Sequence, residues 1–231
     1  MGSIVENISE VRRRIAEAEA RSCRPPGSVT LVAVTKTVGV EAAREALAAG
    51  VNHLGESRVQ EARNKHSAIG DEAVWHMIGP LQTNKAKYCP GLFSLIHSLD
   101  RMELIEELSR RGEKSGKIVE GLLEINVSGE RQKSGCAPEN AKEILLAASK
   151  LSWIKIKGIM TVPPYSDNPE DSRPYFKKLA ALKRELEELG LKNASMDIIS
   201  AGMSGDYEVA IEEGSTLVRV GTAIFGEREE K

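Results

Sequence analysis

The sequence predicts an α/β protein built as a single (β/α)8 barrel, the TIM-barrel class, with an extra helix at the amino terminus. Eight apolar, strand-like segments recur along the 231 residues, and amphipathic helical segments separate them. Glycine directly follows several of the helical segments, as it commonly does where helices end. A doubly wound open parallel sheet is the alternative, because strand counting from one sequence is error-prone.

The chain is expected to begin with a helix. Ser3 and Glu6 have the spacing of a capping box, which satisfies backbone N–H groups at a helix start. Apolar residues then recur at helical spacing: Ile4, Ile8, Val11, Ile15 and Ala18. Prolines at 25 and 26 end this segment. We therefore expect a helix and turn over residues 1–27, the barrel over 28–226, and one domain over 1–231.

The eight expected strands are apolar segments, several of them rich in β-branched residues. They are Val29–Lys36, Asn52–Gly55, Val74–Gly79, Leu95–Leu99, Ile118–Val127, Ile154–Val162, Met196–Ala201 and Leu217–Phe225. Between them, four helical segments each end at a glycine. They are Glu41–Ala49 before Gly50, Arg101–Arg111 before Gly112, the stripe from Phe176 to Leu189 before Gly190, and Asp206–Glu213 before Gly214. A proline-rich surface loop is expected over 162–169.

Composition excludes several classes of partner. The formal net charge is −2, with acids and bases interspersed, so we expect neither a nucleic-acid nor a membrane partner. No segment has the length of a membrane span, and we expect no secretory signal from the residues at the start of the sequence. Cys23, Cys89 and Cys136 form no pair motif, which favours free thiols and a cytoplasmic location. The four histidines share no ligand spacing, so no metal is expected.

Lys36 closes the first expected strand, which is otherwise apolar. In a parallel sheet the carboxyl ends of the strands are where ligands bind. A partly desolvated lysine at that place loses some of its preference for the charged form, and a neutral amine can form an imine with an aldehyde. The alternative is that Lys36 simply extends from the strand end into solvent.

Polar and glycine-rich clusters follow the seventh and eighth strands. Ser200 and Ser204 offer hydroxyl groups, while Gly202, Gly205 and Gly221 let backbone N–H groups approach an anion closely. Barrels often bind phosphate with these two loops. The alternative is that the glycines are turn residues and the serines cap helices.

Arg219 lies inside the apolar eighth strand. It must point either to solvent at a sheet edge or into the mouth of the barrel. A buried arginine stays charged and needs an acceptor, which a heterocyclic nitrogen or an acidic neighbour could supply.

These residues lie in segments that resemble the pyridoxal-phosphate homeostasis protein family, which is related to the amino-terminal barrel of alanine racemase. The resemblance runs from about Leu31 to Gly226. The segments that carry it are 31–37 (LVAVTKT), 55–61 (GESRVQE), 75–85 (WHMIGPLQTNK), 133–135 (KSG), 200–206 (SAGMSGD) and 214–226 (GSTLVRVGTAIFG). Ser57 is a departure, because the family often has asparagine there.

The resemblance implies that the cofactor is pyridoxal 5'-phosphate (PLP) and that Lys36 carries it as an imine. It further implies that Ser200, Gly221 and Thr222 bind the phosphate and that Arg219 faces the pyridine nitrogen. It assigns no catalytic residue and no metal.

The resemblance favours a protein of intracellular PLP homeostasis that buffers PLP, or delivers it to PLP-dependent apoenzymes, without robust catalysis. As a permanent donor, Arg219 would keep the ring nitrogen unprotonated and weaken the electron sink that amino-acid chemistry needs. The chain also ends soon after the eighth strand, whereas the resembling racemases take a second base from an additional domain. A small PLP-dependent amino-acid racemase is the main alternative, and the phosphate cluster alone would also fit a cofactor-free Schiff-base aldolase.

Overall fold

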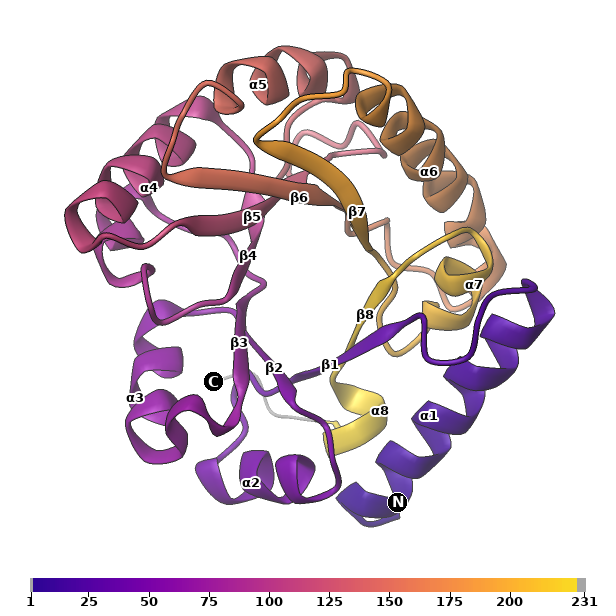
Figure 1. Ribbon diagram of the computed structural model, residues 1–231. Coiled ribbons are helices and arrows are strands. Elements are labelled where there is room, and N and C mark those ends of the chain that lie inside the picture. Colours follow the sequence, from indigo (N-terminus) through magenta and orange to yellow (C-terminus); the bar gives the residue numbers. More distant parts are fainter. Residues whose placement is uncertain (1, 228–231) are drawn as a thin grey trace.

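Eight parallel strands close into a barrel that is surrounded by helices (Figure 1). The structure is a computed structural model that describes residues 2–227. The strands follow chain order around the barrel: β1 Thr30–Val34, β2 His53–Glu56, β3 Val74–Met77, β4 Leu95–Leu99, β5 Val119–Glu124, β6 Ile154–Met160, β7 Ala194–Ser200 and β8 Leu217–Val220. Because β1 also pairs with β8, the predicted barrel is confirmed and the open sheet is excluded.

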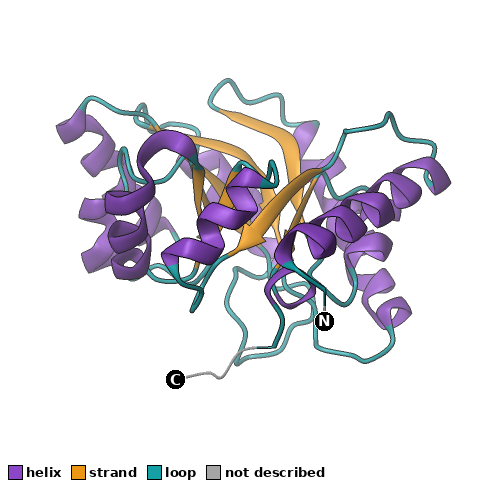
Figure 2. Cartoon of the chain, turned by 90° about the horizontal axis from the view of Figure 1, so that it is seen from below, coloured by secondary structure: helices purple, strands orange, loops and turns teal. Residues whose placement is uncertain are grey.

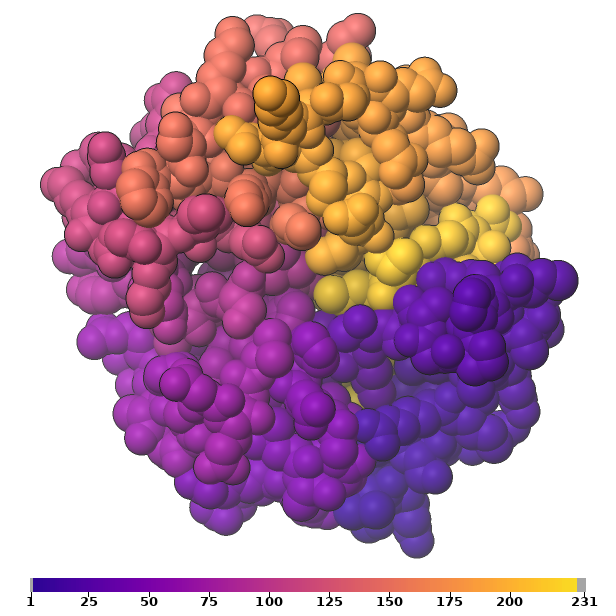
Figure 3. All heavy atoms as spheres, in the orientation of Figure 1, coloured from indigo at the N-terminus to yellow at the C-terminus, as the bar shows by residue number. Residues whose placement is uncertain are grey.

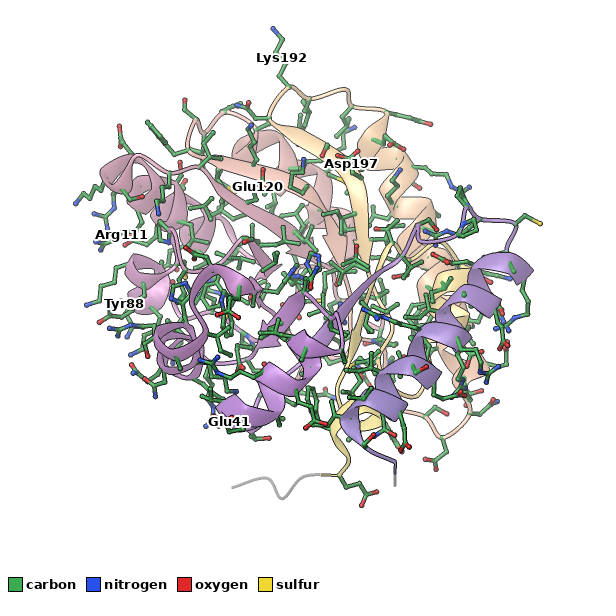
Figure 4. The ribbon with its side chains drawn as sticks, turned by 60° about the horizontal axis from the view of Figure 1, so that its bottom comes forward. Glu41, Tyr88, Arg111, Glu120, Lys192 and Asp197 are labelled. Atoms are coloured by element: carbon green, nitrogen blue, oxygen red, sulfur yellow. The ribbon has the colours of Figure 1, made fainter. Side chains whose placement is uncertain are left out.

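Helices form the layer outside the strands (Figure 2). The α-helices are α1 Ile4–Arg21, α2 Val40–Ala48, α3 Val59–Ile69, α4 Met102–Ser115, α5 Ala141–Ala148, α6 Arg173–Glu187, α7 Tyr207–Glu212 and α8 Thr222–Phe225. Short 3-10 helices are η1 Gly70–Glu72, η2 Thr83–Tyr88, η3 Pro138–Asn140 and η4 Pro169–Ser172. Across residues 2–227, no helix is both long and apolar enough to cross a membrane. Charged side chains such as Glu41 and Arg111 lie at the periphery (Figure 4).

The extra helix α1 begins at the predicted capping box. The backbone N–H of Glu6 donates to Ser3 Oγ at 3.2 Å, and that of Ser3 donates to Glu6 Oε2 at 2.8 Å. The helix packs against α7 and α8, and Figure 3 shows the indigo amino-terminal segment beside the yellow carboxy-terminal one. Because α7 has six residues and α8 has four, α1 supplies apolar cover that these short helices cannot.

Several predicted strands extend beyond the observed ends, and two wrong element ends have a clear physical reason. Helix α4 continues through Gly112 to Ser115 and ends at Gly116, which has a left-handed φ of 67°. Gly112 is needed for close packing instead, because a Cβ there would lie 2.7 Å from the carbonyl oxygen of Lys117. Strand β8 ends at Val220, and the apolar segment after Gly221 turns into α8. The expected bounds of the domain at residues 1 and 228–231 lie outside the described residues, and the single-domain organisation stays a prediction.

The barrel has an apolar core inside its strands and a larger one outside them. The inner core combines Val32, Leu95, Leu122, Met160 and Leu217. Buried polar side chains from β3, β4, β7 and β8 share the interior of the barrel with it: His76, His97, Ser200 and Arg219. The interior is therefore apolar in one part and hydrogen-bonded in another.

Gly158 provides a test of the barrel geometry. The pairing of β6 with β7 shifts register between Ile156 and Gly158, and a Cβ at Gly158 would lie 1.8 Å from the carbonyl oxygen of Ile198. We expect Gly158→Ala to lower the free energy of unfolding by about 3 kcal/mol or more, measured by urea unfolding. The control Gly205→Ala meets no heavy atom within 4 Å and should change little. Equal stability of the two variants would contradict this assignment.

Candidate functional site

Lys36 lies in the turn that follows β1, at the carboxyl end of the barrel strands. The strand ends at Val34, two residues earlier than predicted, so Lys36 leaves the sheet and its side chain is exposed. The partial burial expected for a strand-end lysine is therefore not what the structure shows. Thr35, directly before it, is fully buried.

A buried polar network holds both neighbours of Lys36 in place. Lys65 of α3 donates to Glu56 Oε1 at 2.7 Å, to Glu61 Oε1 at 2.8 Å and to the carbonyl oxygen of Thr35 at 2.5 Å. Thr35 Oγ1 also donates to Glu56 Oε1 at 2.6 Å. The backbone N–H of Thr37 donates to Glu61 Oε1 at 2.6 Å. The backbone on either side of Lys36 is thus bonded to groups of the network formed by Glu56, Glu61 and Lys65.

Thr37 shows that this turn is constrained. Its φ is 63°, in the left-handed region that a β-branched residue rarely adopts. The bond from its N–H to Glu61 opposes relaxation of this conformation. Burial raises the pKa of Glu56, while the ammonium group of Lys65 opposes that shift. Sequence reasoning missed Lys65, although its four-residue spacing from Glu61 on a helix was a usable signal.

Arg219 is buried inside the barrel and finds its acceptors in the barrel wall. Its Nη1 donates to the carbonyl oxygen of Ser200 at 2.9 Å and to the hydroxyl of the same residue. Its Nη2 donates to the carbonyl oxygen of Thr161 at 2.9 Å. Burial lowers the pKa of Arg219 to about 10, against the opposing charges of Glu124 and Asp206. The guanidinium therefore stays protonated at neutral pH and keeps one orientation.

The residues predicted to bind phosphate lie in two places, at the start of α8 and deep inside the barrel. Gly221 and Thr222 lie at the start of α8, where Ser204 Oγ accepts hydrogen bonds from the N–H groups of Gly221 and Ala223, both at 3.2 Å. An oxygen atom in that place already has the donor set that a phosphate oxygen uses. Ser200 is fully buried, and its hydroxyl contacts Arg219 and a histidine. The roles of these residues toward a cofactor stay predictions.

The chain was compared with known proteins. The family model for the alanine racemase N-terminal domain matches residues 6–229. The chain belongs to this family. The pyridoxal phosphate homeostasis protein of Aquifex aeolicus is 46% identical over 224 residues, which cover 96% of this chain and 97% of that protein.

Solved structures are also similar to this chain. PipY of Synechococcus elongatus, with PLP bound, has a TM-score of 0.79 at 35% identity and matches 92% of this chain and all of that chain. Alanine racemase of Clostridium difficile has a TM-score of 0.76 at 16% identity and matches 99% of this chain but 58% of that chain. At that identity the racemase shows a shared barrel fold alone.

Removing Lys65 should release the turn that carries Lys36. We expect Lys65→Met to lower the free energy of unfolding by about 3–5 kcal/mol, because it leaves Glu56 buried without its cation. The double variant with Glu56→Gln should recover part of this loss. Lys183→Met, which removes an exposed pair with Glu187, should cost less than about 1 kcal/mol.

Urea unfolding measures these differences, and hydrogen exchange at the Thr37 amide reports on the turn itself. Faster exchange is expected in Lys65→Met, because Glu61 loses the cation that holds it. Unchanged exchange in a destabilised variant would contradict the link between the network and the turn.

Glu124 predicts a pH dependence of stability. Burial and the charge of Asp100 raise its pKa to about 7 from an ordinary 4.5. The folded state therefore binds the proton more tightly, so this contribution is fully present below pH 4.5 and is lost as pH rises through 7. Relative to wild type, Glu124→Gln should gain up to about 3 kcal/mol at pH 8 compared with pH 4.5, measured by urea unfolding. A pH-independent difference would show that Glu124 has an ordinary pKa.

Proposed function

We propose that this chain binds PLP and serves intracellular PLP homeostasis, by buffering the cofactor or delivering it to PLP-dependent apoenzymes. The proposal is supported by three groups that belong to the paired strands β1 and β8 or to the turns that follow them. These groups are the exposed amine of Lys36, the fixed guanidinium of Arg219 and the N–H groups at the start of α8. Strands β1 and β8 are paired, with Ala33 opposite Val220, so the turns that follow them leave the barrel side by side.

The donor set fits the chemistry of PLP. An aldehyde requires an amine, which Lys36 Nζ supplies, and a phosphate requires N–H and hydroxyl donors, which Gly221, Thr222 and Ser204 supply. A pyridine nitrogen accepts a hydrogen bond, and Arg219 is a donor without an acceptor site. In this proposal Ser200 supports Arg219, because its carbonyl and hydroxyl oxygens both accept hydrogen bonds from Nη1. When bound, PLP supplies a reactive aldehyde and a conjugated ring that can delocalise electrons.

The same geometry supports a carrier without robust catalysis. Arg219 remains a donor, so a ring nitrogen that faces it stays unprotonated and withdraws electrons weakly. Glu56 and Glu61, the carboxylates that bond Thr35 and Thr37 on either side of Lys36, already accept bonds from Lys65. A small PLP-dependent amino-acid racemase is the second candidate, favoured by membership of a family named for alanine racemase.

Borohydride trapping tests the proposal. Purified protein incubated with PLP should become yellow, and reduction should attach the cofactor to Lys36, located by peptide mass spectrometry. Lys36→Ala should lose the label, whereas the control Lys192→Ala should keep it, because Lys192 projects into solvent from the loop before β7 (Figure 4). Labelling at another lysine would overturn the proposed site.

The choice between carrier and racemase needs a separate measurement. The carrier should transfer PLP to an apoenzyme and should not exchange the α-hydrogen of alanine or other amino acids in deuterated water. Exchange that Lys36→Ala abolishes would favour the racemase.

A further inference from the structure

Three histidines form a hydrogen-bonded chain across the barrel interior and end on Arg219. His53 Nδ1 lies 2.9 Å from His76 Nε2, and His76 Nδ1 lies 2.9 Å from His97 Nε2. His97 Nδ1 lies 3.0 Å from Ser200 Oγ, which in turn contacts Arg219. These residues come from β2, β3, β4, β7 and β8, so the closure of the barrel brings them together. The spacing of the histidines in the sequence shows no sign of this chain.

The donor at one end determines the direction of every bond in the chain. Arg219 has only donors, so Ser200 Oγ accepts its hydrogen bond. The hydroxyl proton of Ser200 must then be donated to His97 Nδ1, because a buried hydroxyl proton without an acceptor is costly. His97 is therefore protonated on Nε2 and donates to His76. The same reasoning makes His76 donate from Nε2 to His53 Nδ1.

The burial of the three histidine rings favours their neutral form, as the proposed direction of the chain requires. Burial lowers the pKa of His53, lowers that of His76 to about 3 and lowers that of His97 well below its ordinary value. The positive charge of Arg219 further disfavours an imidazolium at His97. His97 is fully buried, whereas His53 is half-buried and lines a hollow of about 360 Å³ near the amino ends of β1 and β2. The chain thus runs from the barrel interior to the surface at its opposite end.

We propose that His97 is a positioning residue that, through Ser200, orients the guanidinium of Arg219 toward the pyridine nitrogen of PLP. The direction of hydrogen bonding, away from Arg219 and toward His53, is part of this proposal. The statement about the pyridine nitrogen rests on the proposed function, while the direction of the chain does not. The known bonds of Arg219 use Nη1 and one hydrogen of Nη2, so Ser200 and Thr161 can hold the group while its other N–H groups face a ligand.

The direction of the chain is tested in protein without PLP. Nitrogen-15 NMR of histidine-labelled protein near pH 7 should show His53, His76 and His97 neutral, each with a proton on Nε2 and none on Nδ1. His66, whose ring centre lies 5.9 Å from that of Trp75 and outside the histidine chain, is the reference, and His66→Gln assigns its signals. A proton on Nδ1 of His97, or an imidazolium at any of the three, would overturn the proposed direction.

The positioning role is tested with a matched pair of variants. Asparagine and leucine have side chains of similar shape, but only the amide oxygen of asparagine can accept the proton of Ser200. His97→Leu should still be labelled at Lys36 by borohydride. Its PLP dissociation constant should rise roughly tenfold, and the absorption maximum of the bound cofactor should shift, because the Ser200 hydroxyl loses its acceptor and no longer fixes Nη1 of Arg219. His97→Asn should restore both properties toward wild type.

Two outcomes would overturn the positioning role. One is that both variants show wild-type affinity and spectrum, and the other is that they show equal defects. If His97→Leu does not fold, Ser200→Ala replaces it, and His97→Asn should then bind PLP more tightly than Ser200→Ala. If wild type binds no PLP, the proposed function fails, while the NMR result still decides the direction of the chain.

Discussion

A guanidinium group buried inside a closed barrel must find its hydrogen-bond acceptors within the barrel itself. Arg219 meets this requirement with the carbonyl oxygens of Thr161 and Ser200, which lie just after β6 and at the end of β7. Those carbonyls are in place only when β6, β7 and β8 are joined in the correct register. Closure of the sheet and the orientation of Arg219 therefore depend on each other, and the histidine chain extends this dependence to β2, β3 and β4.

A second buried cation, Lys65, lies on the outer side of the strands, whereas Arg219 lies inside the barrel. The side chain of Lys65 extends from α3 toward the ends of β1 and β2. There it forms ion pairs with Glu56 and Glu61 and donates a hydrogen bond to the carbonyl oxygen of Thr35. One buried cation thus acts inside the barrel beside β6, β7 and β8, and another acts outside it beside the ends of β1 and β2. Polar groups at these ends are held rigidly, while the Lys36 side chain that they flank is exposed.

The strand pattern was sufficient to predict all eight strands, because buried parallel strands read as short apolar segments. Apolarity alone could not show that the segment after Gly221 turns into α8, or that Gly112 is a packing residue inside α4. Lys36 and Arg219 could be singled out because each is a charge at the end of, or within, an apolar segment. The histidine chain could not, because its members are distant in the sequence and meet only when the barrel closes. Lys65 lies four residues from Glu61, but that spacing alone could not show that Lys65 is buried and also bonds Glu56 and the backbone of Thr35.

Arg219 and the N–H groups of α8 are fixed by hydrogen bonds, whereas Lys36 is exposed. This difference suits the fold to a carrier. A group that only holds a ligand must let it enter and leave, so a solvent-exposed amine suits exchange better than an enclosed one. The fixed groups must still recognise one ligand among many phosphates and aldehydes. Recognition requires donors that do not move, and here Arg219 and the N–H groups of α8 are fixed by bonds that exist without any ligand. For the proposed carrier, rigid donors and an exposed amine at the same end of the barrel favour both selective binding and release.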